Sequence, residues 1–141
     1  MNVTALEESL DLIAPSGDEL VAVFYKRLFE RAPAVRPLFA HVDMPRQRAM
    51  LLATLVLLRK SLRDLDGIVP KLRELGARHV AYGASAAAYP VVGEVLLASM
   101  AQIAGDAWTP EYEAAWGEAY GVVASVMIEG AEAAGERAAA A

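Results

Sequence analysis

Apolar residues recur every three or four positions along most of the chain, which is the spacing of one face of an α-helix. Capping-box sequences at Thr4–Glu7 and Ser16–Glu19 predict the starts of two helices, and Pro15 ends the first of them. Pro45 opens a long third helix to Leu62, whose apolar stripe is too wide to be covered on one side only. No segment alternates apolar and polar residues as a half-buried strand does, so the predicted fold class is all-α.

The second half of the chain predicts three more helices. One runs from Asp66 or Gly67 to Gly83, one runs from about Ala86 to Ile103, and the last is capped by Thr109. From Ala131 onward, alanine, glutamate and glycine offer little to bury. We therefore expect one domain over residues 1–133 and a frayed, alanine-rich tail over residues 134–141.

Composition narrows the classes of protein to which the chain can belong. Its 141 residues, 56% of them hydrophobic, suffice for one compact domain. The net charge of −5 argues against a nucleic-acid surface, and the longest strongly apolar run, Ala49–Leu58, is too short to span a membrane. The absence of Cys and the acidic amino-terminal segment without a basic flank lead us to expect a cytoplasmic protein.

His79 lies in the middle of an apolar stripe that Ile68, Leu72, Leu75 and Tyr82 form at helical spacing. An imidazole in that place needs a polar partner. It is either a core or surface histidine bonded to a backbone carbonyl, or a metal ligand in an apolar slot, as neutral imidazole is on haem iron. With no Cys in the chain, redox chemistry needs a cofactor.

Two other polar side chains stand next to apolar stripes. Tyr25 borders the stripe of the second helix, where it is either a core ring or a hydroxyl donor into an internal cavity. Gln47 lies near the start of the long helix, either exposed or directed along the face that it shares with Leu51. His41 falls in a corner without an apolar frame, and we expect it to be solvated.

These positions form a recognisable family pattern. The segment Phe24–Phe29 and Phe39 resemble the second helix and following corner of the globins, especially bacterial single-domain haemoglobins and the haem domain of flavohaemoglobins. Gln47 and His79, 32 positions apart, are spaced like the family's distal glutamine and proximal histidine. Further matches are Tyr89, Val92–Gly93, Leu96–Leu97 and Trp116–Gly121. The resemblance implies a globin fold, a three-on-three helical sandwich around haem b.

The resemblance also implies roles for individual residues, with the haem between the long helix and the helix of His79. It implies that His79 is the proximal iron ligand and that Tyr25 and Gln47 donate hydrogen bonds at the sixth position. Arg78 is either the partner of a haem propionate or an exposed cation without a role. The remaining expected cofactor contacts are Phe39, which packs on the porphyrin, Leu51, Tyr89 and Val92.

The chain departs from the flavohaemoglobin pattern behind the proximal histidine. In that family a tyrosine matching Tyr89 joins a late glutamate in a hydrogen-bonded network, but the matching late position here is Ala133, and the acid stands one residue earlier, at Glu132. One residue turns a helix by about 100°, so we expect a weaker network and little peroxidase-like chemistry. The chain holds no Gly-rich dinucleotide or flavin motif, so turnover needs an outside electron donor.

The pattern favours a haemoglobin that reversibly binds oxygen, and other diatomic gases such as NO and CO, at a five-coordinate iron with an open or water-bound sixth position. The alternative is an enzyme, a nitric oxide dioxygenase that forms nitrate and depends on a separate reductase. Both functions need the distal donors that Tyr25 and Gln47 supply. We expect a monomer or weak homodimer with no nucleic-acid partner and no membrane span.

Overall fold

The computed structural model describes residues 1–140, with side chains to residue 136. This part of the chain contains six α-helices and four short 3₁₀ segments, joined by loops. The α-helices are α1 (Val3–Ile13), α2 (Gly17–Arg31), α3 (Met44–Ser61), α4 (Val69–Ala81), α5 (Ala88–Ala104) and α6 (Pro110–Ala140). The 3₁₀ segments are η1 (Ala14–Ser16), η2 (Pro33–Phe39), η3 (Leu65–Ile68) and η4 (Gly105–Ala107). No strand occurs within residues 1–140, so the all-α prediction is confirmed.

The helix starts lie close to their predicted places, although the caps differ at the first two. Helix α1 begins one residue before Thr4–Glu7, and the Asn2 side chain caps it by accepting a backbone amide at 3.1 Å. Ser16 makes no capping hydrogen bond, because α2 continues directly from η1. Asp43 caps α3 through its side chain, and Thr109 caps α6 as predicted.

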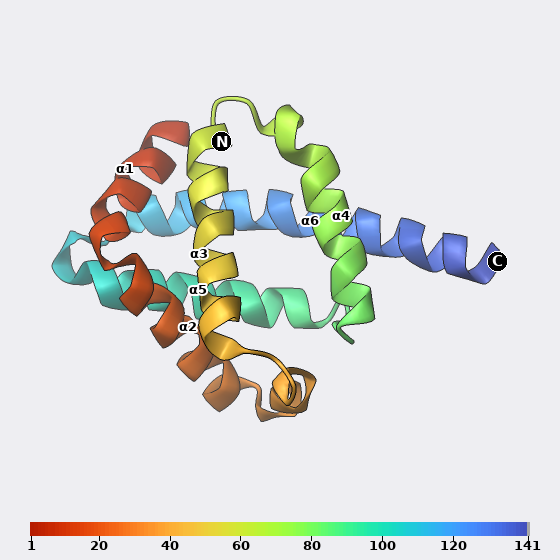
Figure 1. Ribbon diagram of the computed structural model, residues 1–141. Helices are drawn as coiled ribbons and strands as arrows, with labels where there is room; N and C mark the ends of the chain where they lie inside the picture. The colour runs from red at the N-terminus through yellow and green to blue at the C-terminus, as the bar shows by residue number, and fades with distance from the viewer. Residues whose placement is uncertain (141) are drawn as a thin grey trace.

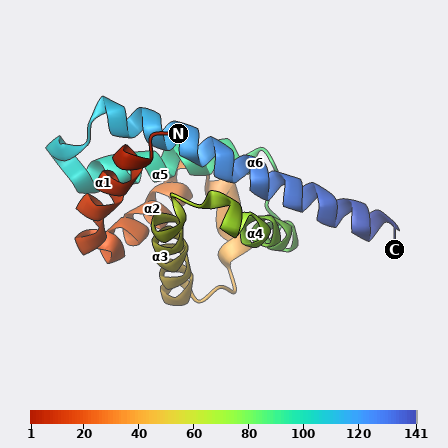
Figure 2. The same ribbon diagram turned by 90° about the horizontal axis from the view of Figure 1, so that it is seen from above.

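Helices α3 and α4 lie on the same side of α6, and α4 lies directly against α6 (Figures 1 and 2). Helix α3 packs on α1 and α2, whereas α4 packs chiefly on α6. The positions of α3 and α4 are therefore set by different parts of the fold.

The buried side chains form two clusters. The larger cluster joins α1, α2, α5 and the first part of α6, and Leu20 and Trp116 are among its least exposed members. The Trp116 indole donates to the Ser9 hydroxyl at 2.8 Å, which satisfies two buried polar groups. The smaller cluster joins α4 to the later part of α6 through Leu72 and Met127. Packing thus ties α4 to α6 by a core of its own.

Helix α4 crosses α6 with the two backbones in direct contact. A Cβ atom on Gly76 would overlap the Met127 carbonyl in α6, and a Cβ atom on Gly130 would overlap the Arg73 carbonyl in α4. Backbone atoms cannot turn aside as a flexible side chain can, so each position accepts only glycine. His79 lies one turn after Gly76, and the crossing therefore sets where the histidine stands.

One helix has the length and apolar composition of a membrane span, namely the window Ala88–Ala107 around α5. The sequence analysis did not single out this window. In the fold, α5 packs against α1, α2 and α6. Its Val95, Leu96 and Met100 are buried in the larger cluster, which is the place of a core helix.

Helix α6 continues to Ala140 and includes residues 134–140 of the tail that the sequence predicts to fray; residue 141 lies outside the described residues. Alanine has the highest intrinsic helix propensity and loses no side-chain entropy in a helix, so this composition supports helix without burial. The end of α6 extends beyond the other helices (Figure 2). The domain limit at residue 133 stays a prediction.

Substituting Gly76 tests the α4–α6 crossing. Gly76→Ala should lower the free energy of unfolding by about 1–3 kcal/mol or more, because overpacking forces the two backbones apart. Gly121→Ala is the matched control, since its Cβ meets nothing within 4 Å and should raise that free energy by about 0.5–1 kcal/mol. Urea unfolding followed by circular dichroism measures both. Equal effects from the two substitutions would show that the crossing tolerates a side chain.

Candidate functional site

Tyr25 and Gln47 meet in a hydrogen bond between α2 and α3. Gln47 Nε2 donates to the Tyr25 hydroxyl at 3.0 Å. A hydroxyl that accepts in this way keeps its own hydrogen free to donate. Tyr25 is only 6% exposed, and burial raises the pKa of its hydroxyl while the bond from Gln47 lowers it to a lesser extent. The hydroxyl therefore stays protonated and is available as a donor.

Three phenylalanine rings surround Tyr25. The Phe24 and Phe39 rings contact it edge-on, with centroids 5.0 Å and 5.8 Å from the tyrosine ring. Phe29 lies 6.2 Å from Tyr25 and 5.3 Å from Phe39, so the four rings form one group. Phe39 is the last residue of η2. Its ring contacts Tyr25 and packs against the larger cluster.

His79 hydrogen-bonds to the backbone of its own helix. Its Nδ1 atom lies 2.7 Å from the Leu75 carbonyl oxygen. A carbonyl can only accept, so Nδ1 carries the proton and Nε2 of the neutral ring is left as a ligand atom. The half-buried ring also contacts Tyr82 edge-on at a centroid distance of 5.5 Å. The carbonyl bond of the first interpretation is therefore present, and it leaves free the nitrogen atom that the second interpretation needs.

Apolar side chains of α3 remain largely uncovered. Within residues 44–61 only Leu55 is buried, whereas Met50 and Val56 are 47% and 45% exposed. Side chains of α3 and α4, among them Leu57 and Leu75, line a shared cavity of about 270 Å³, which we call the slot cavity. Half of the residues that line it are apolar, and the others are Thr54, Lys71, Glu74 and Arg78. The observations that fit the haem implied by the resemblance are the Nε2 atom that His79 leaves free and the uncovered apolar side chains of α3.

Cationic side chains stand at the same cavity. Lys71 and Arg78 line it together with Thr54, and Arg78 also pairs with Glu74 at 2.6 Å. These groups match the anionic propionates at the edge of a haem. Glu74 lines the cavity as well, and Arg78 is exposed with this carboxylate as its partner. The propionate role of Arg78 stays a prediction.

The remaining predicted residues lie on the helices that the prediction named. Leu51 in α3 and Val92 in α5 are half-buried and pack against the larger cluster. His41 is exposed in the corner before α3, as expected for a solvated histidine.

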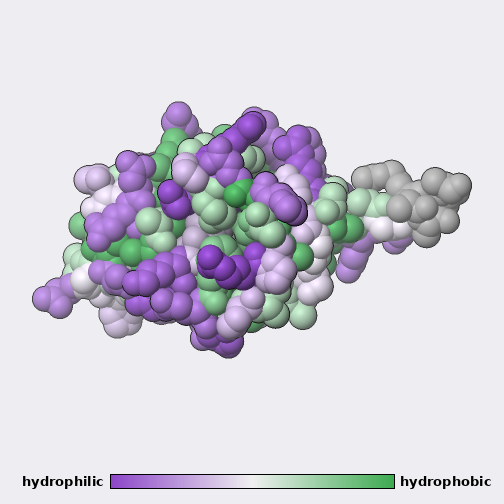
Figure 3. Space-filling model, turned by 60° about the horizontal axis from the view of Figure 1, so that its bottom comes forward, coloured by the Kyte–Doolittle hydropathy of each residue, from purple (hydrophilic) through white to green (hydrophobic). Residues whose placement is uncertain are grey.

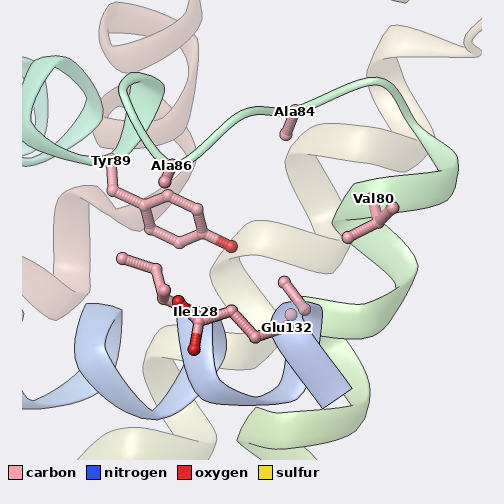
Figure 4. Close-up of a pocket in the computed structure, with 8 residues that line it drawn as sticks. Val80, Ala84, Ala86, Tyr89, Ile128 and Glu132 are labelled. Carbon is pink, nitrogen blue, oxygen red and sulfur yellow. The ribbon is translucent and has the colours of Figure 1, made fainter. Parts of the chain in front are cut away.

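The structure does not join Tyr89 and Glu132 into a hydrogen-bonded network with His79. Tyr89 and Glu132 line a second cavity of about 210 Å³ between α4, α5 and α6 (Figure 4). The buried Tyr89 hydroxyl has no hydrogen-bond partner among the described residues, and burial raises its pKa. The acid that lines this cavity is Glu132. The position matched to the family's glutamate is the next one, Ala133.

Three residues at the site were not predicted from the sequence to be site residues. Thr54 follows Gln47 by seven positions and Lys71 precedes Arg78 by seven, so helical periodicity could have placed both at the slot cavity. The Tyr120 hydroxyl donates to the Tyr89 carbonyl at 2.6 Å and holds the start of α5 against α6. No local signal indicates that last contact, because 31 positions separate the two residues.

Comparison with known sequences points to one family. The model of the globin family matches residues 22–127. The flavohemoprotein of Bacillus subtilis is 27% identical over 128 residues, which are 89% of this chain and 32% of that protein. The flavohemoprotein of Rhizobium meliloti is 30% identical over 118 residues, 82% of this chain and 29% of that protein. The chain thus spans about a third of the length of these relatives.

Solved structures agree with this assignment. An engineered carbene transferase, described as a candidate nitric oxide dioxygenase from Rhodothermus marinus, superposes with a TM-score of 0.85 at 25% identity, covering 96% of this chain and 95% of that one. A bacterial globin from Campylobacter jejuni gives a TM-score of 0.80 at 23% identity, covering 92% and 94%. The predicted globin fold is confirmed, and haem binding is expected of it. The chain belongs to the globin family.

Proposed function

We propose that this globin holds haem b through His79 and reversibly binds oxygen and other diatomic gases. The observation that carries the proposal is the 3.0 Å bond from Gln47 to Tyr25, because it leaves the O–H of a buried tyrosine free to donate. When bound, haem supplies an iron atom whose sixth position takes a diatomic gas. The bond of His79 to the Leu75 carbonyl leaves Nε2 free, and this atom would hold the iron.

Tyr25 and Gln47 decide how tightly a gas is held. A gas ligand that gains electron density becomes a charged acceptor, and a hydrogen bond to a charged group contributes about 1.5–3 kcal/mol, against about 0.5–1.5 kcal/mol for a neutral one. Because about 1.4 kcal/mol corresponds to a factor of ten, one donor changes the dissociation rate about tenfold or more. Two donors favour tight binding and slow release.

The proximal side favours gas binding over peroxide chemistry. A carboxylate that accepts the Nδ1 proton makes a ligating histidine more basic, whereas His79 donates to a neutral carbonyl at 2.7 Å. Glu132 is exposed, and the hydroxyl of Tyr89 makes no bond among the described residues. His79 therefore supplies little of the electron density that cleavage of an oxygen–oxygen bond needs.

A second candidate function is nitric oxide dioxygenation. It is favoured by the names of the relatives, which are flavohemoproteins, and by the structural neighbour described as a candidate nitric oxide dioxygenase. Tyr25 and Gln47 suit this reaction as well, since it begins from the oxygenated ferrous protein. Electrons for each further turnover would come from a reductase outside these 141 residues.

Absorption spectra test the cofactor assignment. The dithionite-reduced protein should show a five-coordinate ferrous Soret band that shifts with carbon monoxide, because Gln47 is a poor iron ligand. His79→Ala should abolish stable haem retention, whereas His41→Ala in the exposed corner should leave the spectrum unchanged. A low-spin, six-coordinate ferrous spectrum, or no Soret band after incubation with haemin, would contradict the assignment.

Oxygen release tests the distal donor. Tyr25→Phe keeps the ring in its aromatic group and removes the hydroxyl, so haem should be retained while the oxygen dissociation rate rises about tenfold or more. Stopped-flow displacement of oxygen by carbon monoxide measures the rate. Tyr112→Phe is the control, since its hydroxyl bonds Glu8 at the surface between α6 and α1. An unchanged rate in Tyr25→Phe would show that the tyrosine only packs the core.

Rapid mixing with nitric oxide separates the two functions. The oxygenated ferrous protein should give one nitrate per haem and then stop as ferric protein, because these residues include no flavin site. Nitrate and haem oxidation state are measured after one mixing and again with NADH and an added flavin reductase. Nitrate formation that continues for many turnovers with the reductase would establish the dioxygenase.

A further inference from the structure

Basic residues are concentrated in the middle of the chain. The segment 36–78 holds nine of the 13 Lys and Arg residues but four of the 18 Asp and Glu residues, which leaves it a net charge of +5. Helix α6 has the opposite balance, with six glutamates and one arginine. The segment forms the end of η2, α3, η3 and α4; α4 packs on α6, and α3 lies farther from α6 (Figure 2). The molecule therefore has a cationic side and an acidic side.

Ion pairs neutralise only some of these cations. The pairs are Arg59 with Glu7 and Asp11, Arg63 with Glu7, Arg73 with Glu129, and Arg78 with Glu74. Within the described part of the chain, five cations of the segment lack a carboxylate within 4 Å, namely Arg36, Arg46, Arg48, Lys60 and Lys71. The excess positive charge on this side is thus open to an outside partner.

One exposed stripe of α3 carries cations at both ends. Arg46, Met50, Ala53, Leu57 and Lys60 follow one another at intervals of three and four positions and share a face of the helix. All except Leu57 are exposed, and Leu57 lines the slot cavity. The stripe therefore borders the place where the haem fits.

Apolar side chains are also exposed where η2 meets the end of α4. Leu38 in η2 lies against the end of α4, with its Cδ2 atom 3.0 Å from the position of a Cβ on Gly83. Leu38 is 44% exposed and Tyr82 is 54% exposed. Figure 3 shows hydrophilic and hydrophobic residues interleaved on the face that includes this end of the molecule. We call Arg36, Leu38, Arg46, Met50, Lys60 and Tyr82 the mouth face.

We propose that the mouth face docks an acidic electron-transfer protein that reduces the haem. The inference rests on the proposed haem function. Oxygen, NO and CO carry no charge, and the haem propionates would be matched by Lys71 and Arg78, so neither accounts for the cations of the mouth face. A ferric haem needs one electron from outside, because the chain holds no Cys and its other side chains are not donors of reducing electrons.

The composition of the mouth face suits a brief encounter. Electron-transfer complexes are small, below about 1,200 Å², and exposed apolar side chains among charges provide a contact that forms and separates quickly. Attraction between a cationic patch and an acidic partner raises association rates by about 10–1,000-fold at low salt. The charge of this face therefore sets the rate of reduction and leaves gas affinity unchanged.

Charge reversal on the mouth face tests the proposal. The probe is a reduced flavodoxin of strongly acidic pI, mixed with the ferric holoprotein in a stopped-flow instrument. Arg46→Glu with Lys60→Glu should lower the second-order reduction rate about tenfold or more at low salt, and about 0.5 M salt should remove the difference. The control, Lys26→Glu with Arg31→Glu on exposed parts of α2, carries the same net charge and should change the rate less than about threefold.

Two further readouts separate this proposal from the haem function. Dithionite reduction and the carbon monoxide spectrum should be the same in both double variants, and their loss in the wild type would overturn the haem function itself. Equal loss of the flavodoxin rate in both variants would overturn the mouth face, because net charge alone would then be responsible.

Binding of oxidised flavodoxin, measured without electron transfer, tests whether the mouth face is the docking surface. Oxidised flavodoxin added to the ¹⁵N-labelled chain should shift amide signals of η2 and of the start of α3. Shifts confined to α6, or none, would overturn the proposal. A salt-sensitive dimer of this chain in sedimentation velocity, lost in Arg46→Glu with Lys60→Glu, would show that the acidic side of a second copy occupies the face instead.

Discussion

The contact between the backbones of α4 and α6 is the constraint on which the site depends. Gly76 and Gly130 each face a carbonyl of the other helix, so α4 cannot slide or rotate without a clash. This fixes the helix that carries His79. It also means that α4 is supported by α6 while α3 is supported by α1 and α2, which leaves the two helices to form opposite walls of one cavity.

On α3 and on α4, one internal hydrogen bond prepares a second polar atom. On α3, Gln47 donates to Tyr25, and the tyrosine hydrogen is left to donate. On α4, the Leu75 carbonyl takes the Nδ1 proton of His79, and Nε2 is left to bind. A donor and a ligand atom therefore come from different elements, each already held in orientation by the protein before any ligand is present.

The charged side chains either join neighbouring helices in ion pairs or remain available to a binding partner. Arg59 and Arg63 tie α3 and the following turn to the acids of α1, and Arg73 ties α4 to Glu129 of α6. Such exposed pairs contribute little individually, because solvent screens the attraction. The cations without a carboxylate partner, in contrast, lie in η2, along α3 and near the start of α4, where their field reaches solvent and can attract an acidic partner.

The sequence by itself determined the six helices, because periodicity, prolines and capping residues act within a few positions of the chain, and it named Tyr25, Gln47 and His79 through their spacing. Only the tertiary structure decided which group accepts each hydrogen, that Glu132 reaches the cavity of Tyr89 without bonding it, and that Gly76 and Gly130 must lack side chains. Met127 lies 51 positions after Gly76, and contacts between such distant backbone atoms exist only once packing has brought their helices together.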